Sequence, residues 1–388
     1  MKKIVFFESS HDIFYGAQQS LYYFLVNTDC DFQKTVVLPG IGVFYDKLVQ
    51  ENIHTEIVEY PKSFQSSGAI IKKSGLAVKL RVVVDAMRYV RGLLKYLKEN
   101  DFDVVYCNDI RTILTAGLAG RMLGIPVVWY VRGCENRSLL NTLAAFLCTK
   151  IVVIAEGIKS SFRKPVVTMR DSVFVTVYSG IDIEAVDEIH VDESLYAELG
   201  ITKDSIVISH VANLNPKKGQ KDLLRALLKL KDSLYFDNIV ILFVGHVISK
   251  HNRVYEEDLR EFVQTNDLEE MVRFLGWRDD GIQIVKMSRF VVSPSYSEGL
   301  PRSVLEAMAC SKAVVATDVG GTRELIDQTN GILINCGDVS GLAQAIDQLC
   351  KNDNLALEMG KQGREKVETS FAIQHYTSSL GCVLEELL

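Results

Sequence analysis

The sequence has 388 residues, of which 48% are hydrophobic and 24% are charged, and its formal net charge is −6. This is the composition of a folded globular protein, and it excludes an intrinsically disordered chain. At about 100–200 residues per domain, the length predicts two domains.

Short β-branched runs alternate with helical patterns through the first 182 residues. This alternation predicts βαβ units with a parallel sheet, and nearly continuous apolar strands predict a sheet covered on both faces. The expected strands are Lys3–Phe7, Lys34–Leu38, Val104–Cys107, Val127–Val131, Ile151–Ile154 and Val173–Val177. The expected helices are Gln18–Val26, Arg88–Lys98 and Thr112–Leu123.

The alternation stops over the acidic stretch Ser179–Ala197 and then starts again. The second set of expected strands is Ile206–Val211, Ile239–Val244, Val272–Leu275, Phe290–Val292, Ala313–Ala316 and Ile332–Ile334. Its helices are Gln220–Lys231, Arg302–Cys310 and Leu342–Cys350. We therefore predict two doubly wound, Rossmann-like α/β domains, residues 1–182 and 183–365, facing each other across a cleft. Residues 366–388 are expected to form a helix that packs back on the first domain.

The sequence carries no pattern of export or of a membrane span. The apolar run Ile4–Phe7 is shorter than the roughly 7–15 residues of a signal sequence, and no run approaches the roughly 20 residues of a transmembrane helix. The eight cysteines are scattered without a Cys-x-x-Cys pair, which argues against a zinc site or a disulfide framework. We expect a cytoplasmic protein without a nucleic-acid partner.

The densest motif is the run from Ser297 to Met308, which follows the expected strand Phe290–Val292. Gly299 allows a tight turn, and Pro301 suits the first turn of a helix. A helix N-terminus after a buried strand binds anions such as a diphosphate, and Glu298 and Glu306 would flank it. The alternative for either glutamate alone is simple complementarity with the helix dipole.

Two further turns follow expected strands. Asn213-Leu214-Asn215-Pro216-Lys217-Lys218-Gly219 places Lys218 where it can meet a phosphate, although it could also be a solvated turn lysine. Phe14-Tyr15-Gly16-Ala17 places Gly16 at the first strand-to-helix turn, where a backbone can approach phosphate. There is no Gly-x-Gly-x-x-Gly and no Walker A motif, which argues against a dinucleotide or ATP site.

Together these motifs resemble the retaining family 4 glycosyltransferases of the GT-B fold. The pair Glu298 and Glu306, spaced Glu-x7-Glu, carries the resemblance. It is supported by Gly320-Gly321-Thr322-Arg323-Glu324, Lys218-Gly219, Gly245, Phe274-Leu275-Gly276 and Asn330-Gly331. The likeness is strong over residues 205–350 and looser over residues 1–182, where it rests on Gly16 and on Val177-Tyr178-Ser179-Gly180-Ile181-Asp182.

The resemblance implies a nucleotide-sugar donor, with UDP or GDP as the nucleotide, and a role for each matching residue. Glu298, with the backbone of Gly299, Leu300 and Pro301, would hold the sugar hydroxyls, and Glu306 would bind the ribose. Lys218 and Gly219 would face the diphosphate, assisted by the backbone at Gly16, Ser303 and Val304. Gly245 would line the donor site, and residues around Trp277 and Arg278 would flank the base.

Two positions depart from the family pattern. Asn213 stands where the family usually has an arginine, and an amide cannot replace the bidentate charge of a guanidinium. Tyr130 stands where the family often has a histidine, and we expect it to take that residue's place in the catalytic site beside Lys218 and Glu298. Lys217 or Arg132 could supply the missing positive charge.

Departure of a nucleoside diphosphate leaves an oxocarbenium-like sugar, so stabilising the leaving group is the main electrostatic task. Lys218 and a helix N-terminus can do this without a metal, and we expect no cofactor and no metal. The resemblance also implies retention of the anomeric configuration. A metal-dependent enzyme would need an Asp-x-Asp at a strand end, whereas Asp29-Cys30-Asp31 and Asp101-Phe102-Asp103 are expected in turns.

The acceptor is expected on the first domain, and the resemblance suggests a glycan or lipid-linked acceptor in cell-surface polysaccharide synthesis. Residues 1–182 carry 22 lysines and arginines against 17 acids, and the basic stretch Lys62–Lys98 contributes much of this excess. That stretch could bind the anionic inner face of a membrane, or it could be a solvated helix face. Two other functions stay open: a catalytically degenerate protein that only binds a sugar nucleotide or a partner, and a sugar-nucleotide epimerase, which would lack the Glu-x7-Glu pair.

Overall fold

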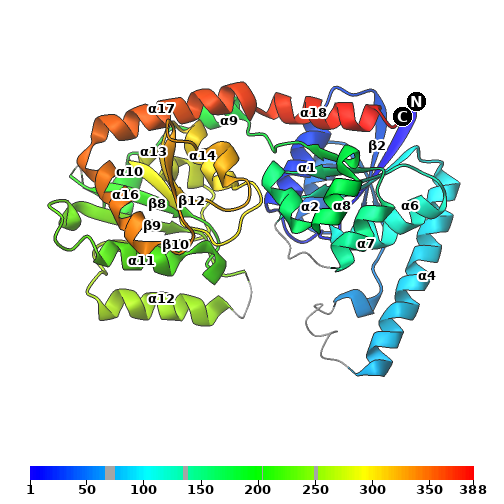
Figure 1. Ribbon diagram of the computed structural model, residues 1–388, viewed down its shortest axis with the longest axis horizontal. Coiled ribbons are helices and arrows are strands. Elements are labelled where there is room, and N and C mark those ends of the chain that lie inside the picture. Colours follow the sequence, from blue (N-terminus) through cyan, green and yellow to red (C-terminus); the bar gives the residue numbers. More distant parts are fainter. Residues whose placement is uncertain (66–74, 134–138, 203, 249–251) are drawn as a thin grey trace. The chain divides into compact units, whose positions relative to one another are not determined.

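The computed structural model describes residues 1–65, 75–133, 139–202, 204–248 and 252–388 (Figure 1). The chain forms two compact units. The first contains Met1–Gly180 together with Ile373–Leu388, and the second contains Ile181–Ala372. The junction expected after residue 182 therefore falls just inside the second unit, and the chain re-enters the first unit at Ile373.

The first unit is built on a parallel sheet of seven strands in the order β3-β2-β1-β4-β5-β6-β7. The strands are β1 (Lys2–Phe7), β2 (Phe32–Leu38), β3 (His54–Ile57), β4 (Val104–Cys107), β5 (Val127–Val131), β6 (Lys150–Val153) and β7 (Phe174–Thr176). The sequence analysis missed β3, which lies at the sheet edge and has no buried residue, so that it lacks the apolar run that marks the others.

The first unit also contains eight α-helices among its described residues. They are α1 (Gly16–Asn27), α2 (Val43–Gln50), α4 (Leu76–Asn100), α5 (Ile110–Thr112), α6 (Leu118–Met122), α7 (Leu139–Leu147), α8 (Lys164–Met169) and α18 (Ile373–Glu385). The helix expected over Thr112–Leu123 is interrupted by a π-helical stretch, Ile113–Gly117. The terminal α18 packs on α1, where the Tyr376 hydroxyl donates to the Ser20 carbonyl at 3.0 Å.

The second unit is built on a parallel sheet of six strands in the order β10-β9-β8-β11-β12-β13. The strands are β8 (Ile206–Val211), β9 (Ile239–Val244), β10 (Val272–Gly276), β11 (Phe290–Ser293), β12 (Ala313–Thr317) and β13 (Gly331–Ile334). All six were predicted, because each is a short apolar run bounded by turn residues.

The helices of the second unit cover both faces of its sheet. They are α9 (Ile183–Glu188), α10 (Ser194–Glu198), α11 (Gln220–Leu228), α12 (Arg253–Thr265), α13 (Gly281–Met287), α14 (Arg302–Ala309), α15 (Thr322–Leu325), α16 (Val339–Lys351) and α17 (Asp353–Ser370). Side chains alternate between the faces of a strand. Accordingly, Ile206 and Ile208 join the core under α11 and α16, whereas Val207 joins the opposite core with Leu195 and Ile284.

Each sheet has one point where the strand order reverses direction. In the first sheet this switch point lies between β1 and β4, and in the second it lies between β8 and β11. In open parallel sheets, ligands bind beyond the carboxyl ends of the strands at such a point. The fold therefore gives one candidate ligand-binding position in each unit. Within the described part of the chain, no helix is both long enough and apolar enough to cross a membrane.

Candidate functional site

The switch point of the second sheet gathers the Lys218 loop, after β8, and the Glu298 loop, after β11. In the first of these, Asn215 caps a short 3-10 turn, Pro216–Lys218, by accepting from the Lys217 amide at 2.9 Å. Gly219 then starts α11 with a φ of 73°, in the left-handed region that favours glycine. A Cβ on Gly219 would lie 2.0 Å from the Pro294 carbonyl oxygen. The lysine loop is thus seated directly against the loop that follows β11.

The Glu298 loop is held from its other side by the turn after β12. Gly320 has a φ of 56°, and a Cβ there would lie 2.0 Å from the carbonyl oxygen of Glu298. The amide of Gly321 donates to the Gly299 carbonyl at 2.7 Å. Pro301 caps α14, whose first turn includes Ser303 and the buried Val304. The amides at the start of this eight-residue helix are therefore placed at the switch point, where an anion can be bound.

The two loops bring Lys218 and Glu298 into direct contact. The ammonium Nζ lies 2.7 Å from the carboxylate Oε1, and the side chains are 26% and 12% exposed. Both groups are thus partly reachable from solvent while they form an ion pair with each other. A phosphate and a sugar hydroxyl could each take over one half of this pair.

Glu306 lies one turn into α14, as expected. Burial raises the pKa of its carboxyl group, and the nearby guanidinium of Arg302 opposes that shift. The Arg302 Nη2 lies 3.5 Å from the Glu306 Oε1. The helix therefore presents a polar carboxylate on the same face as its first turn, a suitable acceptor for ribose hydroxyls.

The remaining predicted donor residues of this unit are placed around the same point by their backbone. Gly245 ends β9 with a φ of 137°, and its amide donates to the Gly276 carbonyl at 2.8 Å. The Asn213 carbonyl accepts from the Gln220 side chain at 3.0 Å. Leu300 is buried, so only its backbone is available to a ligand.

Arg278 is engaged by two acids. It donates to Asp280 and to Glu198 at 2.6 Å each, and these carboxylates raise its pKa. Its charge is therefore already balanced within the protein. The adjacent Trp277 is 57% exposed and meets the ring of His246 edge-on, with 5.7 Å between the ring centres. Trp277 is the flat surface here on which a base could stack.

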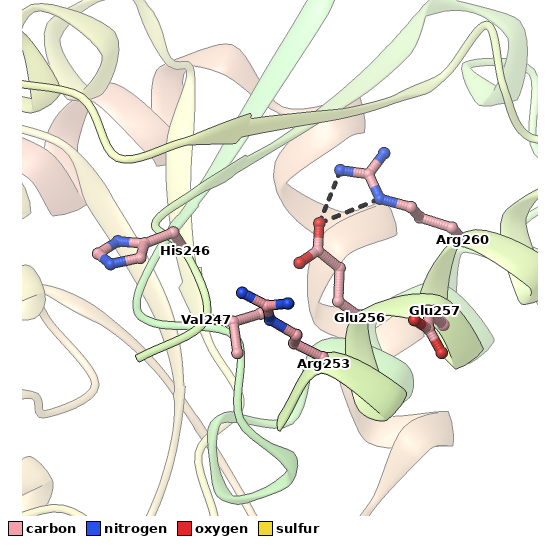
Figure 2. A pocket seen from close by; sticks show the side chains of 6 residues that line it. All are labelled: His246, Val247, Arg253, Glu256, Glu257 and Arg260. Atoms are coloured by element: carbon pink, nitrogen blue, oxygen red, sulfur yellow. Dashed lines mark hydrogen bonds and ion pairs between the residues drawn. The ribbon is translucent and has the colours of Figure 1, made fainter. Parts of the chain in front are cut away.

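A cavity of about 390 Å³ opens beside the carboxyl end of β9 (Figure 2). It is lined by His246, Val247, Arg253, Glu256, Glu257 and Arg260. The last four come from α12, and Arg260 is paired with Glu256 at 2.8 Å. Neither Lys218 nor Glu298 lines this cavity. It therefore flanks the switch point on the His246 side and does not contain the ion pair.

In the first unit, Gly16 is the first residue of α1 and follows the turn after β1, as predicted. The position of Tyr130 does not suit a catalytic residue. Its side chain is fully buried in β5, and its hydroxyl donates to the Val177 carbonyl at 2.6 Å. A substrate cannot touch a group in this position, and we therefore withdraw the catalytic role expected for Tyr130.

The sequence analysis missed a polar cluster in the first unit. Glu8, Asn108 and Arg132 follow β1, β4 and β5 directly and are hydrogen-bonded in series. The sequence indicated Arg132 only as a possible replacement for the missing positive charge, and it did not single out Glu8 or Asn108. Their common signal is that each is the first residue after a buried strand.

Two doubly wound parallel sheets in two compact units are the architecture of the GT-B fold. Comparison with known proteins gives the family. The model of "Glycosyltransferase Family 4" matches residues 58–185, and that of "Glycosyl transferases group 1" matches residues 191–366. The chain belongs to glycosyltransferase family 4.

Among relatives, the chain is 34% identical over 276 residues to the uncharacterized glycosyltransferase MJ1178 of Methanocaldococcus jannaschii, covering 68% of this chain and 70% of that protein. It is 25% identical over 310 residues to the UDP-Gal:alpha-D-GlcNAc-diphosphoundecaprenol alpha-1,3-galactosyltransferase of Escherichia coli, covering 75% and 77% respectively. The crystal structure of Anabaena Alr3699/HepE in complex with UDP matches with a TM-score of 0.79 at 21% identity, covering 100% of both chains. This last likeness shows the fold.

Proposed function

We propose that the protein transfers a sugar from a UDP-sugar to a lipid-linked glycan in polysaccharide synthesis, with retention of configuration and without a metal. The observation that carries the proposal is the contact between Lys218 and Glu298 at the switch point of the second sheet. A related galactosyltransferase is named for a UDP-sugar and a diphosphoundecaprenol acceptor, and a protein of the same fold binds UDP. Both names support this choice of substrates.

The pair explains how one site can serve both halves of the donor. When a diphosphate arrives, the flexible Lys218 stem lets its ammonium turn to the phosphate oxygens, and Glu298 is then released to accept hydrogen bonds from the sugar hydroxyls. The amides at the start of α14 add a second positive region for the same phosphate. Charge that develops on the leaving group is thereby stabilised by groups of the chain itself.

The test is turnover with a panel of UDP-, GDP- and ADP-sugars, measured as release of nucleoside diphosphate in the presence of a lipid-diphosphate-linked sugar acceptor. We expect release from a UDP-sugar that persists in EDTA, and an NMR spectrum of the product that shows the donor's anomeric configuration. Release from GDP- or ADP-sugars alone would contradict the choice of base. An inverted product or a loss of activity in EDTA would contradict the mechanism.

A protein that binds a sugar nucleotide without turning it over is the second candidate. It is favoured by Asn213, which places an amide where the family usually has an arginine, so that Lys218 carries the phosphate charge without that partner. A rise in unfolding temperature with UDP, together with no release from any donor in the presence of acceptor, would support this candidate.

We also propose that α4 forms a surface that binds the membrane. Four apolar side chains at positions i, i+3, i+4 and i+7 are exposed along its N-terminal half: Leu80 (63%), Val83 (47%), Val84 (38%) and Met87 (56%). The same half carries the exposed bases Lys79, Arg81 and Arg88, and the exposed Arg91 lies just beyond it. Asp85 is the only acid between Leu76 and Lys98. Apolar side chains flanked by basic ones suit insertion into an anionic lipid surface.

The position of the helix agrees with this role, because the N-terminal half of α4 reaches away from the sheet of its unit (Figure 1). Its C-terminal half holds it to the core through the buried Leu93 and Leu97. Lys72 and Lys73, which belong to the basic stretch expected from the sequence, lie outside the described residues.

Co-sedimentation with phosphatidylglycerol and phosphatidylcholine vesicles tests this surface. We expect the protein to pellet with the anionic vesicles at low salt. Leu80→Ser/Met87→Ser and Arg88→Gln/Arg91→Gln should each reduce the pelleted fraction severalfold. Leu357→Ser, at a 69% exposed position on α17, is the matched control and should leave pelleting unchanged. Failure of the unaltered protein to pellet with anionic vesicles, or an equal loss in the control, would refute this assignment.

A further inference from the structure

The switch point of the first sheet carries a polar cluster that the donor site described above does not use. Glu8, Asn108 and Arg132 are the first residues after β1, β4 and β5. These three strands are neighbours, and the order reverses between β1 and β4. The three side chains therefore stand in the position where a ligand of an open parallel sheet is bound.

Among the residues that the structure describes, the groups that hold Arg132 are neutral, and Tyr376 is one of them. Its Nε and Nη2 donate to the Asn108 Oδ1 at 3.2 and 3.0 Å, and its Nη2 also donates to the Tyr106 hydroxyl at 3.3 Å. The guanidinium carbon lies 3.9 Å from the centre of the Tyr130 ring, a cation–π contact. Among the described residues, no carboxylate forms an ion pair with Arg132. Within the described ranges, the cation is thus fixed in place without a carboxylate that neutralises its charge.

Arg132 as a whole is partly exposed, but one nitrogen of its guanidinium, Nη1, is buried and forms no hydrogen bond with the described residues. A buried donor without a partner is costly, and for a charged group the cost is larger. Because a guanidinium matches the planar spacing of phosphate oxygens, an oxyanion is the ligand that would satisfy it.

The series from Glu8 to Arg132 explains why the arginine keeps this orientation. The Asn108 side-chain amide donates to the Glu8 Oε2 at 2.5 Å, which leaves the Asn108 oxygen as the atom that faces Arg132. Glu8 is itself held by the Ser10 amide, which donates to its Oε1 at 2.8 Å. Glu8 and Asn108 are therefore positioning residues, and Arg132 is the group available to a ligand.

We propose that Arg132 binds a phosphate group at the β1–β4–β5 edge of the first unit, with Asn108 and Glu8 holding the guanidinium in place. The inference rests on the proposed function for the source of that phosphate, which is either the diphosphate of a lipid-linked acceptor or the diphosphate of the nucleotide donor. The first unit then recognises phosphate with a partly buried cation of its own, whereas Lys218 belongs to the second unit.

Equilibrium binding by the full-length protein tests this site without requiring turnover. Geranyl diphosphate serves as the probe for the acceptor and UDP as the probe for the donor, each titrated into the unaltered protein and into Arg132→Gln, Arg132→Lys, Asn108→Leu and Lys218→Ala. Arg121→Gln, an exposed arginine on α6, is the matched control and should bind both probes normally. The unfolding midpoint of each variant is measured in parallel, and Arg132→Lys keeps the site testable if Arg132→Gln does not fold.

We expect Arg132→Gln and Asn108→Leu to weaken geranyl diphosphate binding by about tenfold or more, because a charge-assisted hydrogen bond is lost. Arg132→Lys should weaken it less, and UDP affinity should stay within about twofold in all three, whereas Lys218→Ala should show the reverse pattern. A selective loss of UDP binding in the Arg132 variants would also support the site and would identify the donor as the source of the phosphate. Unchanged affinity for both probes, or no binding of either probe to the unaltered protein, would overturn the proposal. Loss of UDP binding in Lys218→Ala alone would leave the donor site standing and refute only the Arg132 site.

Discussion

Lys218 and Glu298 are eighty positions apart in the sequence, yet Nζ and Oε1 of these residues lie 2.7 Å apart at the reversal of the second sheet. The contact exists because β8 and β11 are adjacent although three helices and two strands separate them along the chain. The strand order thereby places the cation that we propose for the leaving group beside the carboxylate that we propose for the sugar.

Replacing either member of this pair should reduce sugar transfer. We expect Lys218→Ala to lower kcat by about 10²–10³-fold, the usual cost of losing one group that stabilises developing charge. Glu298→Gln should lower kcat/KM, and the double variant should lose less than the sum, because the two residues act together. Nucleoside diphosphate release measures all three variants. Lys229→Ala, at an exposed position directly after α11 and outside both loops, is the control. An equal loss in Lys229→Ala would contradict the assignment.

Gly219→Ala should destabilise the second unit through a collision as well as through strain. Gly219 and Gly124 have nearly the same φ, 73° and 75°, but a Cβ on Gly124 would meet nothing within 4 Å. Gly124→Ala should therefore show only the strain of the left-handed region, of order 1 kcal/mol. Gly219→Ala should lose clearly more unfolding free energy in urea titrations. Equal losses of unfolding free energy in the two variants would mean that a small backbone shift removes the clash between the new Cβ and the Pro294 carbonyl.

Glu8 should make stability fall as the pH rises towards neutrality. Burial raises the pKa of Glu8 from 4.5 to about 7, and the charge of Asp109 adds to the effect. A carboxyl whose pKa is raised by folding stabilises the protein fully below its unfolded pKa and loses that contribution as the pH passes through its folded pKa. The difference corresponds to roughly 3 kcal/mol between about pH 4 and pH 8.

Glu8→Gln should lack this dependence, since the amide has no proton to lose. Urea unfolding of the unaltered protein and of Glu8→Gln across this range should give free energies that diverge as the pH rises, with the variant relatively more stable at pH 8. Parallel curves would show that Glu8 titrates normally.

Tyr130→Phe should affect stability and leave catalysis intact. The variant removes the hydroxyl that donates to the Val177 carbonyl but keeps the ring under Arg132. We expect a loss of about 1–3 kcal/mol in unfolding free energy, the cost of leaving a buried carbonyl without its donor. The kcat for sugar transfer should stay within about twofold. A large fall in kcat with unchanged stability would restore the catalytic role that the sequence suggested.

Local patterns were enough to predict the strands of both sheets except the edge strand β3, and the helix that follows the Glu298 loop. Strands such as Val127–Val131 and Ile239–Val244 were bounded correctly because a buried parallel strand is a continuous apolar run. The start of α4 was placed at Arg88 and lies at Leu76, because the exposed Leu80, Val83 and Met87 in its first half obscure the usual division into apolar and polar faces.

Relationships between distant residues could not be predicted in the same way. The sequence placed Tyr130 in a histidine's position, but only the structure shows that its ring points into the core and that Arg132 is the polar residue at the strand end. The direct pairing of Lys218 with Glu298 likewise depends on strand order, which local patterns do not contain. The same is true of the series from Glu8 through Asn108 to Arg132.

At Gly219 and Gly320 the backbone lies close to the carbonyl groups of Pro294 and Glu298, and this limits which substitutions the second unit can accept. Because backbone meets backbone at both contacts, the path of the two loops is set without help from the side chains that face a ligand. If Asn213 and Trp277 face the donor as proposed, substitutions there should alter which nucleotide or sugar is accepted while the loops keep their course. Donor preference should therefore be open to redesign one side chain at a time, provided that the two glycines are left untouched.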